Sequence, residues 1–297
     1  MTGASGMLGP YLCRALVASG ARVRGVIRNP KKASFLESEG VELATADLMD
    51  RAALTAAFRG CDAVISNAAL YRVFNLSWQD NYRANKEGTE NVYEAAAAAS
   101  APRIVHMSTF GVYRWHLGKP AIDDASPTLD GSRKQGGAYR GTKQLGEALA
   151  FEISAQRGLQ TTAIRPAGIY GARDYNLMPW LRRWMWLPVI VAPKFWFPFV
   201  YAGDIANAVV GALKNDASAG QRYITAGANA TLFDLINAYK IASGKSNLVW
   251  PLPLGGLGMY VDCSRAEREI GFAPRSFVDG MRETIADDRK YRAAGVG

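Results

Sequence analysis

A tyrosine and a lysine at helical spacing, Tyr139 and Lys143, are the pair in this sequence best suited to acid–base chemistry. Side chains at positions i and i+4 share one face of a helix, so the phenol and the ammonium would be neighbours. A tyrosine with a pKa of about 10 is a poor base at neutral pH, but an adjacent cation stabilises the phenolate and lowers that pKa. Tyr139 could then donate or accept the proton of a carbinol oxygen. A chance surface pair is the alternative interpretation.

A glycine-rich stretch, TGASGMLG over residues 2–9, places glycines three apart before a helix expected over 7–19. Such glycines allow a sharp turn and a close approach to a pyrophosphate, which then faces the free N–H groups of the helix. The stretch therefore predicts a dinucleotide-binding turn, and hydride transfer to or from a nicotinamide would accompany the proton transfer. The residues expected to contact the cofactor are Gly3, Ser5, Gly6, Met7 and Leu8.

The strand that ordinarily precedes such a turn is missing from this sequence, because only Met1 stands before Thr2. In a doubly wound sheet that strand is central, has about five or six residues and is buried on both faces. Loss of several apolar side chains at about 1.5 to 3 kcal/mol each would cost on the order of 10 kcal/mol. We therefore expect a short apolar strand to precede Thr2 in the functional protein.

Strand and helix patterns alternate along the chain and predict an α/β fold, a Rossmann-type doubly wound parallel sheet with a smaller C-terminal substrate-binding lid. Strands are expected at 22–27, 41–44, 62–66, 103–107, 161–164 and 221–225. Helices are expected at 51–58, 78–99, 138–156, 232–243, 264–270 and 277–292, and the segment 118–137 is expected to be a polar loop.

Arg28 closes the strand expected at 22–27, where the chain usually meets the adenosine ribose. An acidic side chain there would accept from the 2′-OH, whereas an arginine can bind a 2′-phosphate through charge-assisted bonds of roughly 1.5 to 3 kcal/mol each. We therefore expect NADP to be preferred; NAD is not excluded, and a plain surface arginine is the alternative. The residues that follow later strands complete the expected cofactor contacts: Asp47, Leu48, Asn67, Ala68, Ala69 and Met107.

Aromatic residues crowd together between Asp174 and Phe199, with Arg182, Arg183 and Lys194 among them. Several prolines and Lys194 argue against a membrane-spanning helix, so a pocket wall and a peripheral membrane contact are the two interpretations. We assign this stretch to a substrate-binding region. The expected division is 1–171 plus 202–226 for the dinucleotide domain and 172–201 plus 227–297 for the substrate region.

The formal charge of +9 and the pI near 9.5 come from basic residues spread along the chain rather than gathered in runs. An anionic ligand or a solvated arginine-rich surface explains them, and we expect no nucleic-acid partner. The cysteines, Cys13, Cys61 and Cys263, lack metal-ligand spacing. We therefore expect a cytoplasmic protein in a reducing compartment, with no metal and no signal peptide.

Taken in order, these motifs resemble the extended short-chain dehydrogenase/reductase family, which contains NAD(P)-dependent sugar epimerases, dehydratases and dihydroflavonol-type reductases. The matching motifs span nearly the whole chain: TGASGMLG, ADL, NAAL, NKEGTEN, MSTFGVY, YRGTK, RPAGIYG and FVYAGDIA. The chain departs from the family where Arg114 follows Tyr113 in place of a frequent glycine and where Asn67 replaces a common histidine. These departures weaken assignment to any one subfamily.

The resemblance implies roles for the matching residues. Tyr139 would be the acid–base, Lys143 would bind the nicotinamide ribose, and Thr109 would hydrogen-bond the reacting oxygen, with Ser108 as the fallback. Asn85 would support a structural or proton-relay water or serve the fold alone. Pro166, Ile169 and Tyr170 would lie along the nicotinamide.

The implied reaction is hydride transfer to or from a secondary alcohol or ketone, as in a reductase or an epimerase. A dehydratase is less expected, because Phe110 rather than an acidic residue follows Thr109. The aromatic stretch favours a bulky, partly apolar substrate, whereas Arg182 and Arg183 leave an anionic nucleotide sugar as a second candidate. The alternative from another class is a non-catalytic NADP-binding sensor or scaffold. The family also implies a homodimer formed through the two long helices.

Overall fold

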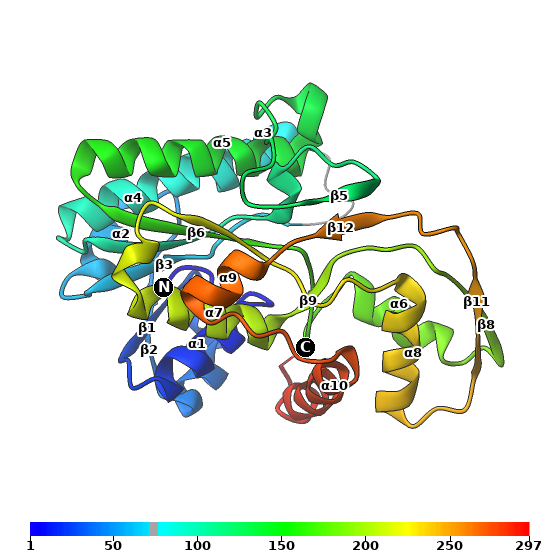
Figure 1. Ribbon diagram of the computed structural model, residues 1–297. Coiled ribbons are helices and arrows are strands. Elements are labelled where there is room, and N and C mark those ends of the chain that lie inside the picture. The colour runs from blue at the N-terminus through cyan, green and yellow to red at the C-terminus, as the bar shows by residue number, and fades with distance from the viewer. Residues whose placement is uncertain (72–76, 297) are drawn as a thin grey trace.

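The computed structural model describes residues 1–71 and 77–296 and shows a parallel sheet with helices on both faces (Figure 1). Four strands pair in the order β10-β6-β4-β3, with the bounds Arg222–Thr225, Gln160–Pro166, Arg103–Met107 and Ala63–Ser66. β1 (Val23–Ile27) and β2 (Val41–Thr45) form a further parallel pair. The alternation of strands and helices and the parallel pairing confirm the predicted α/β class.

Met1 and Thr2 lie between β1 and β3, at the position of the strand that ordinarily precedes the glycine turn. The Thr2 amide donates to the Ile65 carbonyl at 2.9 Å, and the Val26 amide donates to the Met1 carbonyl at 2.7 Å. Thr2 thereby forms a parallel bridge with Val26. These two residues hydrogen-bond to both halves of the sheet and hold the glycine turn at the carboxyl ends of the neighbouring strands.

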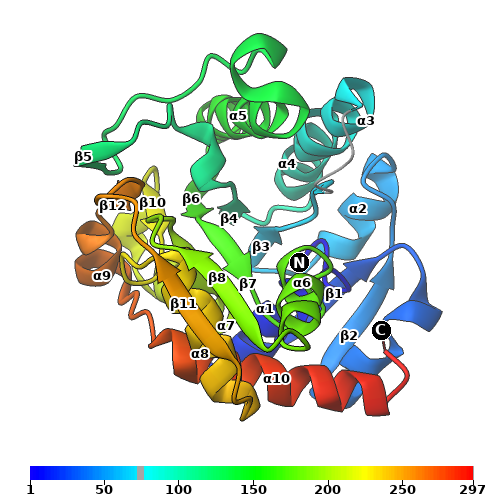
Figure 2. The same ribbon diagram turned by 90° about the vertical axis from the view of Figure 1, so that its right-hand side faces the viewer.

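The helices form two layers around the sheet (Figures 1 and 2). One layer contains α2 (Arg51–Phe58), α4 (Gly88–Ala98) and α5 (Arg133–Arg157). The other contains α1 (Gly9–Ala18) and α7 (Ala202–Lys214), with α9 (Ser264–Ile270) packed against α7. None of the helices within the two described ranges combines the length and the apolar character that a membrane span requires.

The helix predicted over 78–99 is divided into three parts. α3 (Trp78–Tyr82) passes into a π-helical turn, η3 (Arg83–Glu87), and α4 follows. A π-turn is a single turn with i→i+5 hydrogen bonds inside an otherwise α-helical stretch, and the helical pattern over 78–99 does not reveal it. The stretch predicted as a polar loop over 118–137 contains β5 (Gly118–Ile122) and the first turn of α5, which breaks at Gly137 (φ 62°).

Short strands and helices extend the molecule beyond the carboxyl ends of the central strands (Figure 1). They form three two-stranded parallel sheets, β7–β9, β8–β11 and β5–β12. Their bounds are Gly168–Tyr170 for β7, Val189–Pro193 for β8, Phe199–Tyr201 for β9, Leu248–Leu252 for β11 and Met259–Val261 for β12. α8 (Leu232–Ser243) packs on β8 and β11, α10 (Phe277–Ala293) packs on α8, and α6 (Leu177–Trp184) lies between β7 and β8 along the chain.

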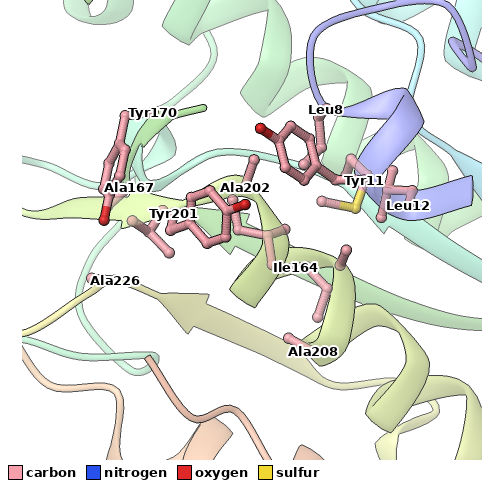
Figure 3. Close-up of a cluster of buried hydrophobic side chains, with 14 of the residues drawn as sticks. Leu8, Tyr11, Leu12, Ile164, Ala167, Tyr170, Tyr201, Ala202, Ala208 and Ala226 are labelled. Carbon is pink, nitrogen blue, oxygen red and sulfur yellow. The ribbon is translucent and has the colours of Figure 1, made fainter. Parts of the chain in front are cut away.

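A buried aromatic cluster ties the glycine-turn helix to this extension (Figure 3). Tyr11 of α1 packs edge-to-face on Tyr201 with ring centroids 5.5 Å apart, and Tyr170 lies on the other side of Tyr201 at 5.7 Å. The Tyr11 hydroxyl accepts a hydrogen bond from the Ala172 amide at 2.7 Å. The segment after β7 is thereby fixed relative to the turn that is expected to bind a dinucleotide.

Candidate functional site

A cleft of about 990 Å³ runs along the carboxyl ends of the central strands. Its size exceeds the needs of one small substrate and suits a dinucleotide together with a substrate. All but one of the residues predicted to contact the cofactor line it: Gly3, Ser5, Gly6, Met7, Leu8, Arg28, Asp47, Leu48, Asn67, Ala68, Ala69, Met107, Tyr139, Lys143, Pro166 and Ile169. The cleft therefore brings together segments that are far apart in the sequence.

The remaining predicted contact, Tyr170, does not line the cleft; it is buried in the aromatic cluster. β7 explains the difference. Successive side chains of a strand point to opposite faces, so Ile169 faces the cleft while Tyr170 faces the core beside Tyr201 and Phe277. The expected contact between Tyr170 and the nicotinamide is therefore corrected.

The glycine turn needs its glycines for close approach. Gly3 has a φ of 66°, and a Cβ on it would lie 2.9 Å from the backbone of Ala68. A Cβ on Gly9 would lie 2.1 Å from the Ala4 carbonyl oxygen. The Thr2 hydroxyl accepts from the amides of Asn67 and Ala68, at 3.1 Å each, and so fixes the turn against the end of β3. The turn offers an open backbone surface that fits the pyrophosphate of a dinucleotide.

Arg173 is a site residue that the sequence analysis missed. Its Nη2 donates to the Ser5 carbonyl of the glycine turn at 3.1 Å, and its backbone N–H donates to Asp288 Oδ1 at 3.0 Å. Its Nε and Nη1 are buried and have no hydrogen-bond partner among the described residues. Buried guanidinium donors without partners are costly, so they suit an anion bound at the turn. The only sequence signal was a cation two residues after the RPAGIYG motif.

Tyr139 and Lys143 lie one turn apart on α5 and both line the cleft. Burial, together with Tyr71, raises the pKa of Tyr139 above its ordinary value, and a hydrogen bond with Thr109 only partly offsets this rise. Lys143 is 3% exposed and its Nζ donates to the Met107 carbonyl at 2.6 Å. The expected lowering of the tyrosine pKa is absent, because the ammonium is turned to Met107 and burial of the phenol dominates.

The buried position of Lys143 changes its own titration. Burial lowers the pKa of Lys143 to about 8, although the charge of Glu147 acts in the opposite direction. The ammonium is therefore mostly protonated at neutral pH but loses its proton far more readily than an exposed lysine. It is held where it can bind a ribose hydroxyl and contribute positive charge to the cleft.

Thr109 rather than Ser108 faces Tyr139. Thr109 Oγ1 accepts from the Gly111 amide at 3.1 Å, which leaves the hydroxyl proton free for Tyr139 or for a substrate oxygen. Ser108 is buried beside Glu147, where it lowers the pKa of that carboxyl, and its Oγ makes no hydrogen bond of normal geometry within the described part of the chain. The contacts favour the first choice made from the sequence.

Asn85 lies outside the cleft, in the π-helical turn, and is 1% exposed. Its Oδ1 accepts from the Leu70 amide at 2.9 Å, and its Nδ2 donates to Thr142 Oγ1 at 3.1 Å. Thr142 Oγ1 in turn donates to the Ala138 carbonyl at 2.6 Å. These bonds link the loop after β3 to the turn of α5 that carries Tyr139. Asn85 thus holds these two segments together without lining the cleft itself.

A buried ion pair beneath the cleft fixes α5 on the sheet. Arg165 of β6 donates to both carboxylate oxygens of Glu147, and its Nη1 donates to the Tyr113 hydroxyl at 2.6 Å. Burial alone would raise the pKa of Glu147, but the hydrogen bonds and charge of Arg165 outweigh it and hold this pKa at about 2. Glu147 follows Lys143 by one helical turn, so the Glu147–Arg165 ion pair helps to fix the position of Lys143 relative to the sheet.

The end of the cleft beside β1 and β2 carries Arg28 and Asp47. Arg28 is exposed at the end of β1 and takes part in none of the ion pairs within residues 1–71 and 77–296. Asp47 accepts from the Met49 amide at 2.9 Å and shapes the turn that carries Leu48. Position 28 holds an arginine and not the acidic residue that would accept a hydrogen bond from a ribose 2′-OH.

The opposite end of the cleft is lined largely by aromatic and aliphatic side chains: Trp115, Ile169, Tyr175, Leu177, Phe197 and Phe199. Arg182 and Arg183 do not line it. Arg182 pairs with Asp288 at 2.6 Å, and Arg183 is exposed. Arg182 and Arg183, the cations that made a nucleotide sugar a candidate substrate, therefore lie outside the cleft. In the described ranges, no group of three or more His, Cys, Asp or Glu side chains is arranged to hold a metal ion.

Residues 1–226 match the NAD dependent epimerase/dehydratase family. A 4-hydroxy-2-methyl-3-oxo-4-farnesyl-3,4-dihydroquinoline-1-oxide ketoreductase of Stigmatella aurantiaca is 33% identical over 183 residues, which cover 61% of this chain and 53% of that protein. The chain thus spans about half the length of that relative. A sterol-4-alpha-carboxylate 3-dehydrogenase, decarboxylating, of Dictyostelium discoideum is 26% identical over 86% of this chain and 80% of its own length.

Among solved structures, a UDP-glucose-4-epimerase of Stenotrophomonas maltophila with bound NAD superposes with a TM-score of 0.83 at 21% identity, over 99% of this chain and 98% of that one. At this identity the likeness shows the fold alone. The family match covers the glycine turn, the Tyr–Lys pair and the strands between them, in agreement with the ordered motifs. The chain therefore belongs to the NAD dependent epimerase/dehydratase family.

Proposed function

We propose that this protein transfers hydride between NADP(H) and a bulky, largely apolar ketone or secondary alcohol, with Tyr139 as the acid–base residue. The observation that carries the proposal is the pairing of Tyr139 with Thr109 in a cleft whose substrate end is aromatic and aliphatic. The exclusion of Arg182 and Arg183 from the cleft favours this substrate class over a nucleotide sugar. Release of the reduced or oxidised cofactor, as in a reductase, then fits better than its reuse in an epimerase.

The residues present fit a dinucleotide, because Gly3, Ser5 and Gly6 of the glycine turn line the cleft and Arg173 beside them has two donors without partners among the described residues. The glycine turn and Arg173 would hold the pyrophosphate, and Arg28 would hold a 2′-phosphate. Asp47 and Leu48 would lie at the adenine, and Lys143 would bind the nicotinamide ribose. When bound, the nicotinamide supplies or accepts the hydride.

The proton moves at Tyr139. In the reducing direction the carbonyl oxygen accepts hydrogen bonds from the hydroxyls of Thr109 and Tyr139, which polarise the carbon–oxygen bond. As hydride adds to the carbon, the phenol proton passes to the oxygen, giving the alcohol and a phenolate. The raised pKa of Tyr139 keeps the phenol protonated at neutral pH, which suits the acid role. Lys143 lies one turn away with its ammonium on the Met107 carbonyl, and this ammonium would have to turn toward Tyr139 to stabilise the phenolate left behind.

The cleft also supports the proposed division of the chain. The dinucleotide domain would comprise 1–171 plus 202–226, and the substrate region 172–201 plus 227–297. Tyr175, Leu177, Phe197 and Phe199 come from the second region and line one end of the cleft, whereas the glycine turn lies at the other. Substrate choice would then be set by the second region.

The test is turnover of NADPH with a panel of aryl and alicyclic ketones, with nucleotide sugars as the comparison class. We expect reduction of apolar ketones, and we expect Tyr139→Phe to abolish it while NADPH still binds. Tyr71→Phe is the matched control, because it keeps the ring against Tyr139, with centroids 4.8 Å apart, and removes only a hydroxyl. Unchanged turnover in Tyr139→Phe would contradict the assignment of Tyr139 as the acid–base residue. Stoichiometric NADP binding without turnover of any substrate would favour the sensor or scaffold alternative.

A further inference from the structure

One face of the β8–β11 sheet is apolar and exposed. The side chains alternate along both strands, so that Ile190, Ala192 and Val249 are buried toward α8 while their neighbours face outward. The parallel register sets Val189 beside Leu248 and Val191 beside Trp250. The outward residues form what we call the β8–β11 face: Trp186, Leu187, Val189, Val191, Leu248, Trp250 and Leu252.

The exposed fractions on this face are large for apolar side chains. Trp186 is 83% exposed, Val191 61% and Trp250 59%. The two strands stand at one end of the molecule, and Figure 2 shows them toward the viewer, in front of α8. Single exposed apolar residues are ordinary, but five on two paired strands, with two more in the loop before β8, mark an interaction surface.

The loop that presents Trp186 and Leu187 is fastened to β11. Asn247 Nδ2 donates to the carbonyl oxygens of Met185, at 3.1 Å, and Leu187. The Leu248 amide donates to the Pro188 carbonyl at 3.0 Å. The apolar surface is therefore preorganised, and binding at it would cost little ordering of the backbone.

The charged side chains in the two stretches that form the face are all basic. The sequence contains no Asp or Glu over 180–201 or over 244–260. Arg183, Lys194 and Lys245 are exposed in these stretches, and the Lys245 ammonium lies 5.1 Å from the centroid of the Trp186 ring. Arg182 is neutralised by Asp288. The face thus combines tryptophan and aliphatic side chains with cations that no neighbour in these stretches neutralises.

We propose that the β8–β11 face docks on an anionic lipid bilayer. Tryptophan and aliphatic side chains gain free energy by entering the boundary between headgroups and acyl chains, and lysine and arginine extend to the headgroup phosphates. Each basic residue close to an anionic surface adds a further favourable interaction. A second copy of this chain is a poorer occupant, because a two-fold contact would set the cations of one face against those of the other.

Docking in this way brings the substrate end of the cleft to the membrane side of the molecule. The chain leaves β8 at Pro193 and reaches Phe197 and Phe199, which line the cleft, within a few residues. The Lys194 amide donates to the Leu252 carbonyl at 2.8 Å, so the segment that leads from β8 to the cleft wall is held to β11. The proposal rests on the face itself and does not depend on the proposed reaction.

The experiment measures co-sedimentation of the full chain with vesicles of mixed phosphatidylglycerol and phosphatidylcholine, and with pure phosphatidylcholine vesicles. We expect binding to the mixed vesicles that weakens with added salt and is much weaker on neutral ones. The double variant Trp186→Ser, Trp250→Ser should bind at least about tenfold more weakly. Lys194→Gln and Lys245→Gln should each lower the affinity by about fivefold for anionic vesicles.

Leu117→Ser is the matched control, since Leu117 is 52% exposed but lies outside the face and the cleft. It should bind vesicles as the unaltered chain does. NADPH affinity and thermal unfolding of every variant verify that the fold is retained. The proposal is overturned if the unaltered chain ignores anionic vesicles or if the tryptophan variant binds as well as the control. It is also overturned if the chain forms a dimer that the tryptophan variant loses, because the face would then be covered by a second copy.

Discussion

Arg173 Nη2 donates to the carbonyl oxygen of Ser5 at 3.1 Å, so a cation from the segment after β7 rests on the glycine turn. The φ of Arg173 is 63°, a conformation that costs a non-glycine residue about 1 kcal/mol or more. Its backbone N–H is held by Asp288 of α10. The fold therefore maintains a strained backbone that holds the Arg173 guanidinium against the glycine turn, with its Nε and Nη1 buried and without hydrogen-bond partners among the described residues.

Replacing Arg173 by Gln should weaken binding of NADP and NAD alike, by about tenfold to a hundredfold, because charge-assisted hydrogen bonds of roughly 1.5 to 3 kcal/mol would be lost. Fluorescence titrations with NADPH and NADH measure both affinities. Arg183→Gln is the control, since Arg183 is exposed and lies outside the cleft. A loss confined to NADPH would instead place Arg173 at the 2′-phosphate.

Arg28 should decide between the two cofactors. It is exposed at the end of β1, so Arg28→Asp should leave the free energy of unfolding nearly unchanged. The substitution would repel a 2′-phosphate and offer an acceptor to a 2′-OH, so the ranking of NADP and NAD affinities should reverse. Titration of the variant with both cofactors measures the ranking. If NADP remains preferred in Arg28→Asp, the side chain is a surface arginine without a role in selection.

The sequence was sufficient for the elements whose apolar pattern extends over several turns or over a buried strand. α2, β4, α8 and α9 have the predicted bounds. The short strands β7, β8, β11 and β12 were not predicted, because three to five residues carry little pattern and their pairing partners lie far along the chain.

The candidate site also has features that the sequence predicted and features that it did not. The motif order predicted which segments meet at the cleft, because the carboxyl ends of parallel strands share one edge of a sheet. It did not reveal Arg173, whose position depends on contacts with Ser5 and Asp288, nor that Tyr170 faces the core. The direction of the Lys143 ammonium was equally hidden, since its partner is a backbone carbonyl.

Glu147→Gln should lower the free energy of unfolding by about 3 to 5 kcal/mol, because it leaves the buried Arg165 guanidinium without its counter-charge. The double replacement Glu147→Leu, Arg165→Met should cost less than the sum of the single changes. Urea unfolding measures the stability of Glu147→Gln, of the single variants Glu147→Leu and Arg165→Met, and of the double variant. Glu152→Gln, exposed on the same helix, is the control and should stay within about 0.5 kcal/mol of the unaltered chain.

The same carboxyl gives a pH dependence. Because Arg165 holds the pKa of Glu147 at about 2, below the value in an unfolded chain, its contribution is fully present above about pH 4.3. It is lost as the pH falls toward about 2. The stability difference between the unaltered chain and Glu147→Gln should therefore shrink through this window. A difference that stays constant between about pH 4.3 and about pH 2 would contradict the assigned pKa.

Lys143 should destabilise the free protein at neutral pH, in the opposite sense to Glu147. Burial lowers its pKa to about 8 from about 10.4 in an unfolded chain, so the unfolded state binds more protons between these values. Stability attributable to Lys143 must therefore rise with pH across this window, by about 1.4 kcal/mol per pH unit. Below about pH 8 the penalty is complete.

Lys143→Met removes this titration and serves as the comparison. Urea unfolding at neutral pH and near the upper end of the window should show the unaltered chain gaining about 3 kcal/mol relative to the variant. Lys134→Met, exposed near the start of the same helix, should differ from the unaltered chain by the same amount at both pH values. If Lys143→Met also shows a constant difference, the ammonium is solvated in the free protein. The buried hydrogen bond to Met107 would then not be its resting position.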